Sequence, residues 1–208
     1  MSGVPQNFQA ISSVLANYNF VDIASGTGYI NFYAGKTVDL ALLSNFTYYS
    51  DTITTDFTVA SAAYNKIVDQ DFDVLLNRPL DLKGLGIVNV PVFGLSNQVH
   101  LYAVATLRKW TGAVETDIVS NTSSVLDSAG SSYKMLAVDL NIPLTHFKIG
   151  EYLRLTIEIW EKTTGAASSG KYAHDPKNRT TGLGTDVWDS TGACPSQLSF
   201  QCPVRLNL

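Results

Sequence analysis

The sequence contains few charged side chains and no run of basic ones. Asp, Glu, Lys and Arg make up only 15% of the 208 residues, and the formal net charge is −4 at pH 7. Proteins that wrap nucleic acid need clustered Lys and Arg to neutralise phosphates. The composition therefore argues against a nucleic-acid partner, and the low charge fits a chain that buries surface against other proteins.

Cysteine is also scarce. The only two cysteines, Cys194 and Cys202, are eight positions apart, with the strand-like segment QLSFQ between them. An extended segment of that length holds its ends too far apart for a disulfide. We therefore expect two free thiols and a protein that assembles in a reducing cytoplasm.

Long apolar runs are absent. No stretch approaches the roughly 18 apolar residues of a membrane-spanning helix. Residues 1–17 lack both the basic start and the continuous apolar core of a cleaved signal peptide. We expect a soluble protein with no membrane partner.

Motifs for metals, nucleotides and activated nucleophiles are missing as well. The three histidines, His100, His146 and His174, are far apart, and none has a second His or Cys at metal-ligand spacing. The glycines of SGTGYINFYAG lie between predicted strands and open no helix, which argues against a nucleotide site. We predict no metal, no cofactor, no catalytic residue and no enzymatic activity. A hydrolase with two carboxylates facing each other across a cleft stays open as a third interpretation.

The sequence does contain a strict alternation of apolar and polar residues, clearest between Gly150 and Trp160. Four apolar residues occupy every second position there: Leu153, Leu155, Ile157 and Ile159. Successive side chains of a strand point to opposite faces, so this segment is predicted as a strand with one buried and one wet face.

About ten or eleven such strands, spaced by short turns, select an all-β protein over a βαβ architecture. We predict an antiparallel, jelly-roll-like β-sandwich that forms a single domain over residues 1–208. Apolar residues at helical spacing predict one short helix over residues 7–16, within an N-terminal arm of residues 1–17. The Gly- and Ser-rich range 163–195 is expected to be a long surface loop region.

Two details of strand structure are also predicted. Gly84 and Gly86 lie inside an apolar strand pattern, where they indicate a bulge or bend. Pro143 is expected to end the strand that begins at Tyr133.

Asp69, Asp71 and Asp73 share one face of a predicted strand. They could bind calcium through carboxylate oxygens. The favoured interpretation is a solvent-exposed strand whose like charges prevent aberrant pairing.

Aromatic residues on the polar faces of the strands are the strongest candidates for a binding surface. They are covered by a second layer of the same chain, meet another subunit, or stack on sugar rings. The candidate interface residues are Tyr102, Trp110, Tyr152, Arg154, Trp160 and Trp188.

The C-terminal two thirds of the chain resembles small β-rich structural proteins of tailed-phage virions. The resemblance is carried by RPLDLKGLGIVNVPVFG, LYAVATLRKWTGAVETDIVSNTSS and KMLAVDLNIPLTHFKIGEYLRLTIEIW, with the HDPKNRT loop and the PVRLNL strand. It implies a jelly-roll or similar sandwich in the virion shell or tail, without catalysis.

The resemblance implies a virion structural protein, assembled in the host cytoplasm. An acidic chain fits the outside of a capsid or a tail better than the genome side. We expect a capsid cement or decoration protein that bridges capsid subunits, with the major capsid protein or other virion proteins as partners. Self-association, with a trimer by analogy, is also expected. The alternative is a carbohydrate-binding β-sandwich module of a tail or receptor-recognition protein.

Overall fold

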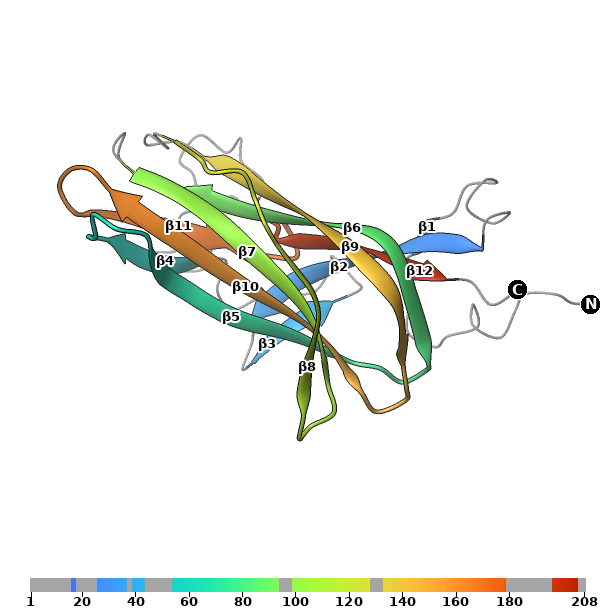
Figure 1. Cartoon of the computed structure of the whole chain (residues 1–208). Helices are drawn as coiled ribbons and strands as arrows, with labels where there is room; N and C mark the ends of the chain where they lie inside the picture. Colours follow the sequence, from blue (N-terminus) through green and yellow to red (C-terminus); the bar gives the residue numbers. More distant parts are fainter. Residues whose placement is uncertain are drawn as a thin grey trace, which may run out of the picture.

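A computed structural model describes residues 16–17, 26–36, 39–43, 54–93, 99–127, 133–178 and 196–205. Every regular element in these ranges is a strand (Figure 1). The strands are β1 (Ala16–Asn17), β2 (Thr27–Lys36), β3 (Leu40–Leu43), β4 (Thr54–Val59), β5 (Asn65–Leu75), β6 (Leu80–Phe93), β7 (Val99–Trp110), β8 (Glu115–Thr122), β9 (Lys134–Phe147), β10 (Tyr152–Thr163), β11 (Ser168–Ala173) and β12 (Ser199–Arg205).

Eight strands form two antiparallel sheets. Sheet I has the order β5–β10–β7–β8, and sheet II has the order β2–β12–β6–β9. This is the pairing of a double-sheet jelly roll. β1 and β3 extend sheet II beside β2, and β11 pairs with both β6 and β4. One parallel bridge, between Ala41 of β3 and Asp73 of β5, links the two sheets. The predicted all-β, jelly-roll-like sandwich is confirmed.

The core lies between the two sheets and is built from alternating residues. Leu153, Leu155, Ile157 and Ile159 of β10 are all fully buried. Their neighbours in β7 include Leu107, which pairs with Leu155, and the small Ala105, which pairs with Ile157. The alternation that predicted this strand is therefore the cause of its two faces.

Two glycines of β6 show why a bend was predicted there. Gly84 has a φ of +127°, a backbone conformation that residues with a Cβ rarely adopt. A Cβ on Gly86 would come within 2.9 Å of a ring carbon of Phe200. The β6–β9 register shifts between Leu82 and Gly84, so the predicted irregularity is confirmed.

The prediction that Pro143 ends a strand was wrong, because β9 continues to Phe147. Ile142 pairs with Gly84 and Thr145 with Leu82, so Pro143 lies in a bulge of β9. The missing N–H of a proline removes no ladder hydrogen bond at such a position.

Part of the range 163–195 also differs from its prediction as surface loop. Residues 168–173 form β11, and Tyr172 is fully buried, with its hydroxyl donating to Gln70 Oε1. Pairing with both β4 and β6 holds this segment in place. Residues 179–195 lie outside the described part, as does the helix predicted over residues 7–16, except for Ala16, which begins β1.

Two further predictions concerned free thiols and membrane-spanning segments. Cys202 is a buried free thiol, and burial raises its pKa well above the usual range; Cys194 lies outside the described residues. In the part of the chain that the structure describes, no helix has the length and hydropathy to span a membrane.

Three connections meet at one end of the sandwich, which lies at the bottom of Figure 1. They are residues 76–79 after β5, 111–114 after β7 and 148–151 after β9. Backbone hydrogen bonds join the first and the last, since Gly150 N donates to Leu76 O and Leu76 N donates to Glu151 O. Gly150, with a φ of +85°, permits the turn. We call this end the hairpin end.

Replacing Leu155 by Ala should destabilise the protein by about 3 kcal/mol, because a cavity opens between the sheets. Leu144→Ala is the matched control, since that leucine is 58% exposed on β9 and its loss should cost less than about 0.5 kcal/mol. Urea unfolding of both variants measures the difference. Equal losses would contradict the assignment of the core.

Glu161 should make the stability depend on pH. Its side chain is inward-facing, the residue is 1% exposed, and no hydrogen-bond partner of its Oε2 lies in the described residues. Burial raises the pKa of Glu161, which a hydrogen bond from the Ala60 N–H only partly offsets. The folded state therefore holds the proton more tightly than the unfolded state, and stability falls as pH rises from the unfolded pKa toward the folded one.

Glu161→Gln should remove this fall in stability. The free energy of unfolding of the variant, relative to that of the wild type, should therefore increase from pH 4 to pH 7. Urea unfolding across this pH range measures the effect. Asp56→Asn, at a carboxylate whose side chain is 73% exposed, is the control and should leave the wild-type profile in place. If the stability of the wild type instead rises over this range in parallel with that of Glu161→Gln, Glu161 does not have a raised pKa in the folded state.

Candidate functional site

The solvent-facing side of sheet I, which we call the outer face, carries most of the residues that the sequence singled out. Antiparallel register places them in rows across β5, β10, β7 and β8. Tyr152 lies between Leu75 and Trp110, Arg154 between Asp73 and Arg108, and Trp160 between Lys66 and Tyr102. In the described part of the chain, Tyr102, Trp110, Tyr152, Arg154 and Trp160 all remain partly exposed on this face.

Arg154 is at the centre of a charge network on the outer face. Its Nε and Nη2 donate to the two carboxylate oxygens of Asp73, both at 2.7 Å, and its Nη1 donates to Glu115 Oε1 at 3.0 Å. The side chain is only 15% exposed. These carboxylates raise the pKa of Arg154 further above its ordinary value, Asp73 most strongly. The two-pronged geometry fixes β5, β10 and β8 relative to each other.

Arg108 extends the same network. Its Nε donates to Asp117 at 2.7 Å and its Nη1 to Thr156 Oγ1 at 2.9 Å, while Thr156 donates to Asp71 at 2.5 Å. We call these charged residues the charged belt: Asp71, Asp73, Arg108, Glu115, Asp117 and Arg154.

Each of the three aspartates has a cationic neighbour. Asp71 and Asp73 are neutralised by arginine, and Asp69 pairs with Lys66 at 2.6 Å. Across the described ranges, no group of three or more His, Cys, Asp or Glu residues is placed to hold a metal ion. The calcium interpretation finds no support in this arrangement.

At the hairpin end, the outer face carries aromatic and aliphatic side chains. The rings of Trp110 and Tyr152 are 4.6 Å apart, and the Arg154 guanidinium lies 4.3 Å from the Trp110 ring centroid. Leu75 beside them is 46% exposed, and the turn residues Val114 and Ile149 are 62% and 66% exposed. We call Leu75, Trp110, Val114, Ile149 and Tyr152 the hairpin-end patch.

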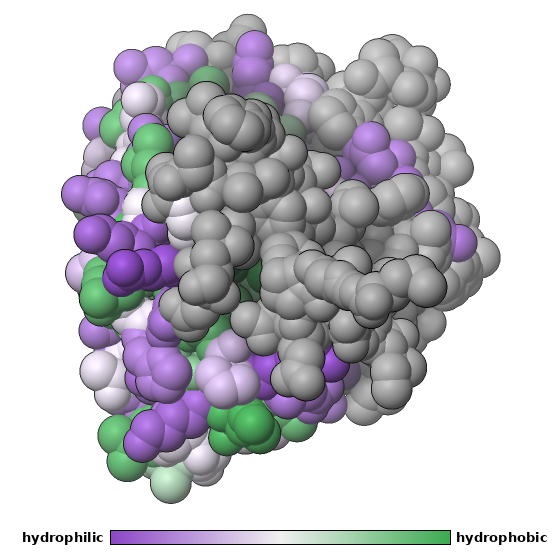
Figure 2. Space-filling view, turned by 90° about the vertical axis from the view of Figure 1, so that its right-hand side faces the viewer, coloured by the Kyte–Doolittle hydropathy of each residue, from purple (hydrophilic) through white to green (hydrophobic). Residues whose placement is uncertain are grey.

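The turns that carry the hairpin-end patch are held together by polar contacts. Lys109 Nζ lies 3.5 Å from Glu151 Oε2 and also donates to the backbone oxygen of His146. Glu151 in turn accepts a hydrogen bond from Lys148 N at 2.7 Å, which lowers the pKa of Glu151. Figure 2 shows exposed hydrophobic residues among hydrophilic ones along its lower edge, the end of the molecule where these turns lie.

A second aromatic group lies toward the other end of the outer face. Tyr64, Tyr102 and Trp160, which we call the aromatic triad, have neighbouring ring centroids 5.1 Å and 6.3 Å apart, and the Tyr102 and Trp160 planes differ by only 4°. Eight residues separate Tyr152 from Trp160 along β10, which is about 26 Å. The two aromatic groups are therefore separate sites on one face.

The five described candidate interface residues, Tyr102, Trp110, Tyr152, Arg154 and Trp160, all lie on the outer face, and Trp188 lies outside the described residues. Their division into two groups was not predicted. Sequence reasoning also missed Tyr64, Leu75, Val114 and Ile149. For Val114 and Ile149 the sequence did offer a signal, an apolar residue within a Gly-containing turn, as in TGAV and KIGE.

The three histidines are not brought together. His100 bonds to Asp127 and His146 to Asp81, both at 2.6 Å, while His174 Nε2 lies 3.0 Å from Thr55 Oγ1. His174 is fully buried beside Tyr172 and Phe72. Each imidazole therefore has a local partner of its own.

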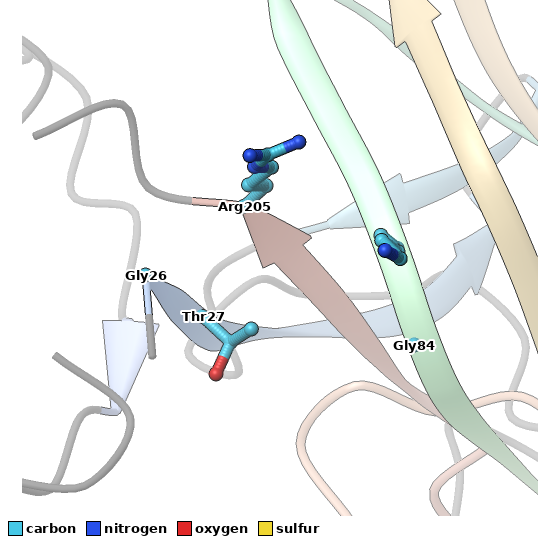
Figure 3. Close-up of a pocket in the computed structure, with 5 residues that line it drawn as sticks. Gly26, Thr27, Gly84 and Arg205 are labelled. Atoms are coloured by element: carbon cyan, nitrogen blue, oxygen red, sulfur yellow. The ribbon is translucent and has the colours of Figure 1, made fainter. Parts of the chain in front are cut away.

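A shallow pocket of about 270 Å³ lies on sheet II, between β2, β6 and β12. It is lined by Gly26, Thr27, Lys83, Gly84 and Arg205. Figure 3 shows Arg205 extending from the end of β12 and Thr27 at the start of β2. Of the described residues that line the pocket, two are cationic and none is acidic, so their charge favours anions.

Comparison with known proteins gives the fold of the chain but no family. No family model matches the sequence, and no curated protein matches it. An aminopeptidase from a marine sediment archaeon, Thaumarchaeota archaeon, is 7% identical, with a TM-score of 0.56 over 87% of this chain and 37% of its own. An α-amino acid ester hydrolase is 9% identical, with a TM-score of 0.54 over 84% of this chain and 36% of its own.

A CocE/NonD family hydrolase from Staphylococcus aureus is 13% identical, with a TM-score of 0.50 over 86% of this chain and 37% of its own. The prediction of a protein without enzymatic activity is corrected by these three matches, because the same fold occurs in hydrolases. This chain spans little more than a third of their length, and at such identities the likeness shows the fold alone.

Replacing Arg154 by Met should destabilise the protein by about 2 kcal/mol, because three carboxylates would lose their shared cation in a partly buried place. Arg154→Lys should recover part of the loss, since it keeps the charge but not the two-pronged geometry. Lys171→Met is the control, because its exposed pair with Asp56 should contribute less than about 0.5 kcal/mol. Urea unfolding of the three variants at low salt measures these differences.

Proposed function

We propose that this chain is an assembly module that binds neighbouring protein subunits through the hairpin-end patch. The observation that carries the proposal is the exposure of Leu75, Val114 and Ile149, each at least 46% exposed, beside the Trp110–Tyr152 pair. Exposed apolar residues gathered at one place mark interaction surfaces.

The composition of the hairpin-end patch favours a protein as its partner. Trp, Tyr and Arg are the residues that most often dominate protein–protein binding energy. Trp110 already contacts both Tyr152 and Arg154, so little side-chain entropy remains to be lost on binding. The charged belt beside them supplies the polar rim that such interfaces have.

The setting proposed for this assembly role is a virion. The sequence resembles structural proteins of tailed-phage virions, and a jelly roll is a fold found in viral capsids. In that setting the partners are the major capsid protein or other virion proteins, and the chain acts as a cement or decoration protein. A stable contact needs about 800 Å² from each partner, so it would extend from the hairpin-end patch onto the charged belt.

Carbohydrate binding is a second candidate function. It is favoured by a different observation, the nearly parallel rings of Tyr102 and Trp160 at the other end of the outer face. Aromatic rings of this kind supply flat apolar area for stacking.

Replacing Val114 and Ile149 together by Ser should weaken assembly about tenfold or more, since burying two aliphatic side chains is worth about 1.5 kcal/mol or more each. The measurements are light scattering during gel filtration, which gives the oligomeric state, and co-sedimentation with capsids of the encoding virus that lack this protein. The wild type is expected to pellet with those capsids.

Val125→Ser is the control, because that valine is 46% exposed near the opposite end of β7. It should pellet with capsids as the wild type does. A wild-type protein that is monomeric and ignores capsids would refute the assembly role.

A further inference from the structure

The aromatic triad has features that the assembly role leaves unused. Tyr64 is 36% exposed, and Tyr102 and Trp160 are partly exposed on the outer face. Cross-strand pairing places Tyr102 directly opposite Trp160, with ring planes 4° apart. The Tyr64 ring is tilted by 59° to that of Tyr102. The three rings therefore form one partly exposed aromatic cluster on the outer face.

Charged side chains of both signs border these rings and are fixed in place. Glu158 accepts hydrogen bonds from Trp160 Nε1 at 2.8 Å and from Lys66 Nζ at 3.0 Å. Lys66 also pairs with Asp69 at 2.6 Å, and Lys162 Nζ lies 4.8 Å from the Tyr64 ring centroid. The contacts hold the Trp160 ring and its polar border before any ligand arrives.

The charge of this border limits the chemistry of the ligand. Lys66 and Lys162 are balanced by Asp69 and Glu158, so these four groups carry no net charge. A groove for single-stranded nucleic acid joins its aromatic rings to an excess of positive charge, which is missing here. A neutral ligand with an apolar face and a polar rim matches the site best.

A neutral saccharide has that combination. The C–H groups of a pyranose ring give it an apolar face that stacks on aromatic rings, and its hydroxyls both donate and accept hydrogen bonds. Carboxylate oxygens of Glu158 would accept from hydroxyls, and the ammonium groups of Lys66 and Lys162 would donate to them. Sites for small ligands have this form, a mostly apolar lining with a few fixed polar groups.

We infer that the aromatic triad, with Lys66, Glu158 and Lys162, is a binding site for a neutral oligosaccharide. The site lies about 26 Å from the Trp110–Tyr152 pair, measured along β10. The inference rests on the carbohydrate-binding candidate named above and specifies its residues and ligand class. The site is separate from the hairpin-end patch that carries the assembly role.

The test is binding of the full chain to an array of neutral, sialylated and sulfated oligosaccharides, followed by titration of the best neutral probe with calorimetry. The wild type is expected to bind at least one neutral probe, and Trp160→Ala should weaken that binding about tenfold or more through loss of the stacked ring. Tyr64→Ala is the second variant, because that side chain is the most exposed of the three and its loss disturbs the sheet least.

Tyr29→Ala is the matched control, since that tyrosine is a partly exposed aromatic residue of β2 in sheet II. It should bind the probe as the wild type does. Thermal unfolding of each variant shows whether it remains folded at the assay temperature. Binding to charged probes alone, binding to none, or neutral binding that Tyr64→Ala and Trp160→Ala leave unchanged would overturn the inference.

Capsid co-sedimentation separates this inference from the assembly role. Trp160→Ala and Tyr64→Ala should pellet with capsids as the wild type does, while Val114→Ser/Ile149→Ser should keep its saccharide affinity. A protein that binds capsids but no saccharide overturns only the site at the aromatic triad. A protein that binds a saccharide but no capsid overturns only the assembly role.

Discussion

The two faces of β10 are the constraint on which the rest of the structure depends. Because successive side chains of a strand point in opposite directions, the residues that fill the core also fix the position of those between them. Leu155 cannot be buried without placing Arg154 and Thr156 on the outer face. The same backbone that closes the sandwich therefore positions the charge network and, at its two ends, the aromatic groups.

The sequence was sufficient to predict the fold because alternation is a local property. Leu153 to Ile159 can be assigned to the core without any knowledge of their neighbours in space. The candidate site could be predicted only as far as its face. Arg154 and Asp73 are 81 residues apart in the sequence, and only the register of β10 against β5 brings them together. In the same way, the register of β10 against β7 brings Tyr152 opposite Trp110.

The bulge at Pro143 and the strand β11 were not predicted, for related physical reasons. A proline usually ends a strand because it lacks an N–H, but Pro143 lies where the ladder already skips a residue. Tyr172 falls in a Gly- and Ser-rich stretch whose composition is typical of loops. Its burial depends on β4 and β6, which are distant in the sequence. Such outcomes are decided by tertiary packing, which overrides local composition.

The choice of arginine at the centre of the outer face has a consequence for the surface as a whole. A guanidinium stays protonated at every pH that a protein survives, whereas an ammonium or imidazole loses its proton in alkaline or neutral solution. The two guanidinium groups of the charged belt, on Arg108 and Arg154, therefore keep their positive charge in neutral and in alkaline solution. A partner that recognises the charged belt therefore meets the same two cations in neutral and in alkaline surroundings.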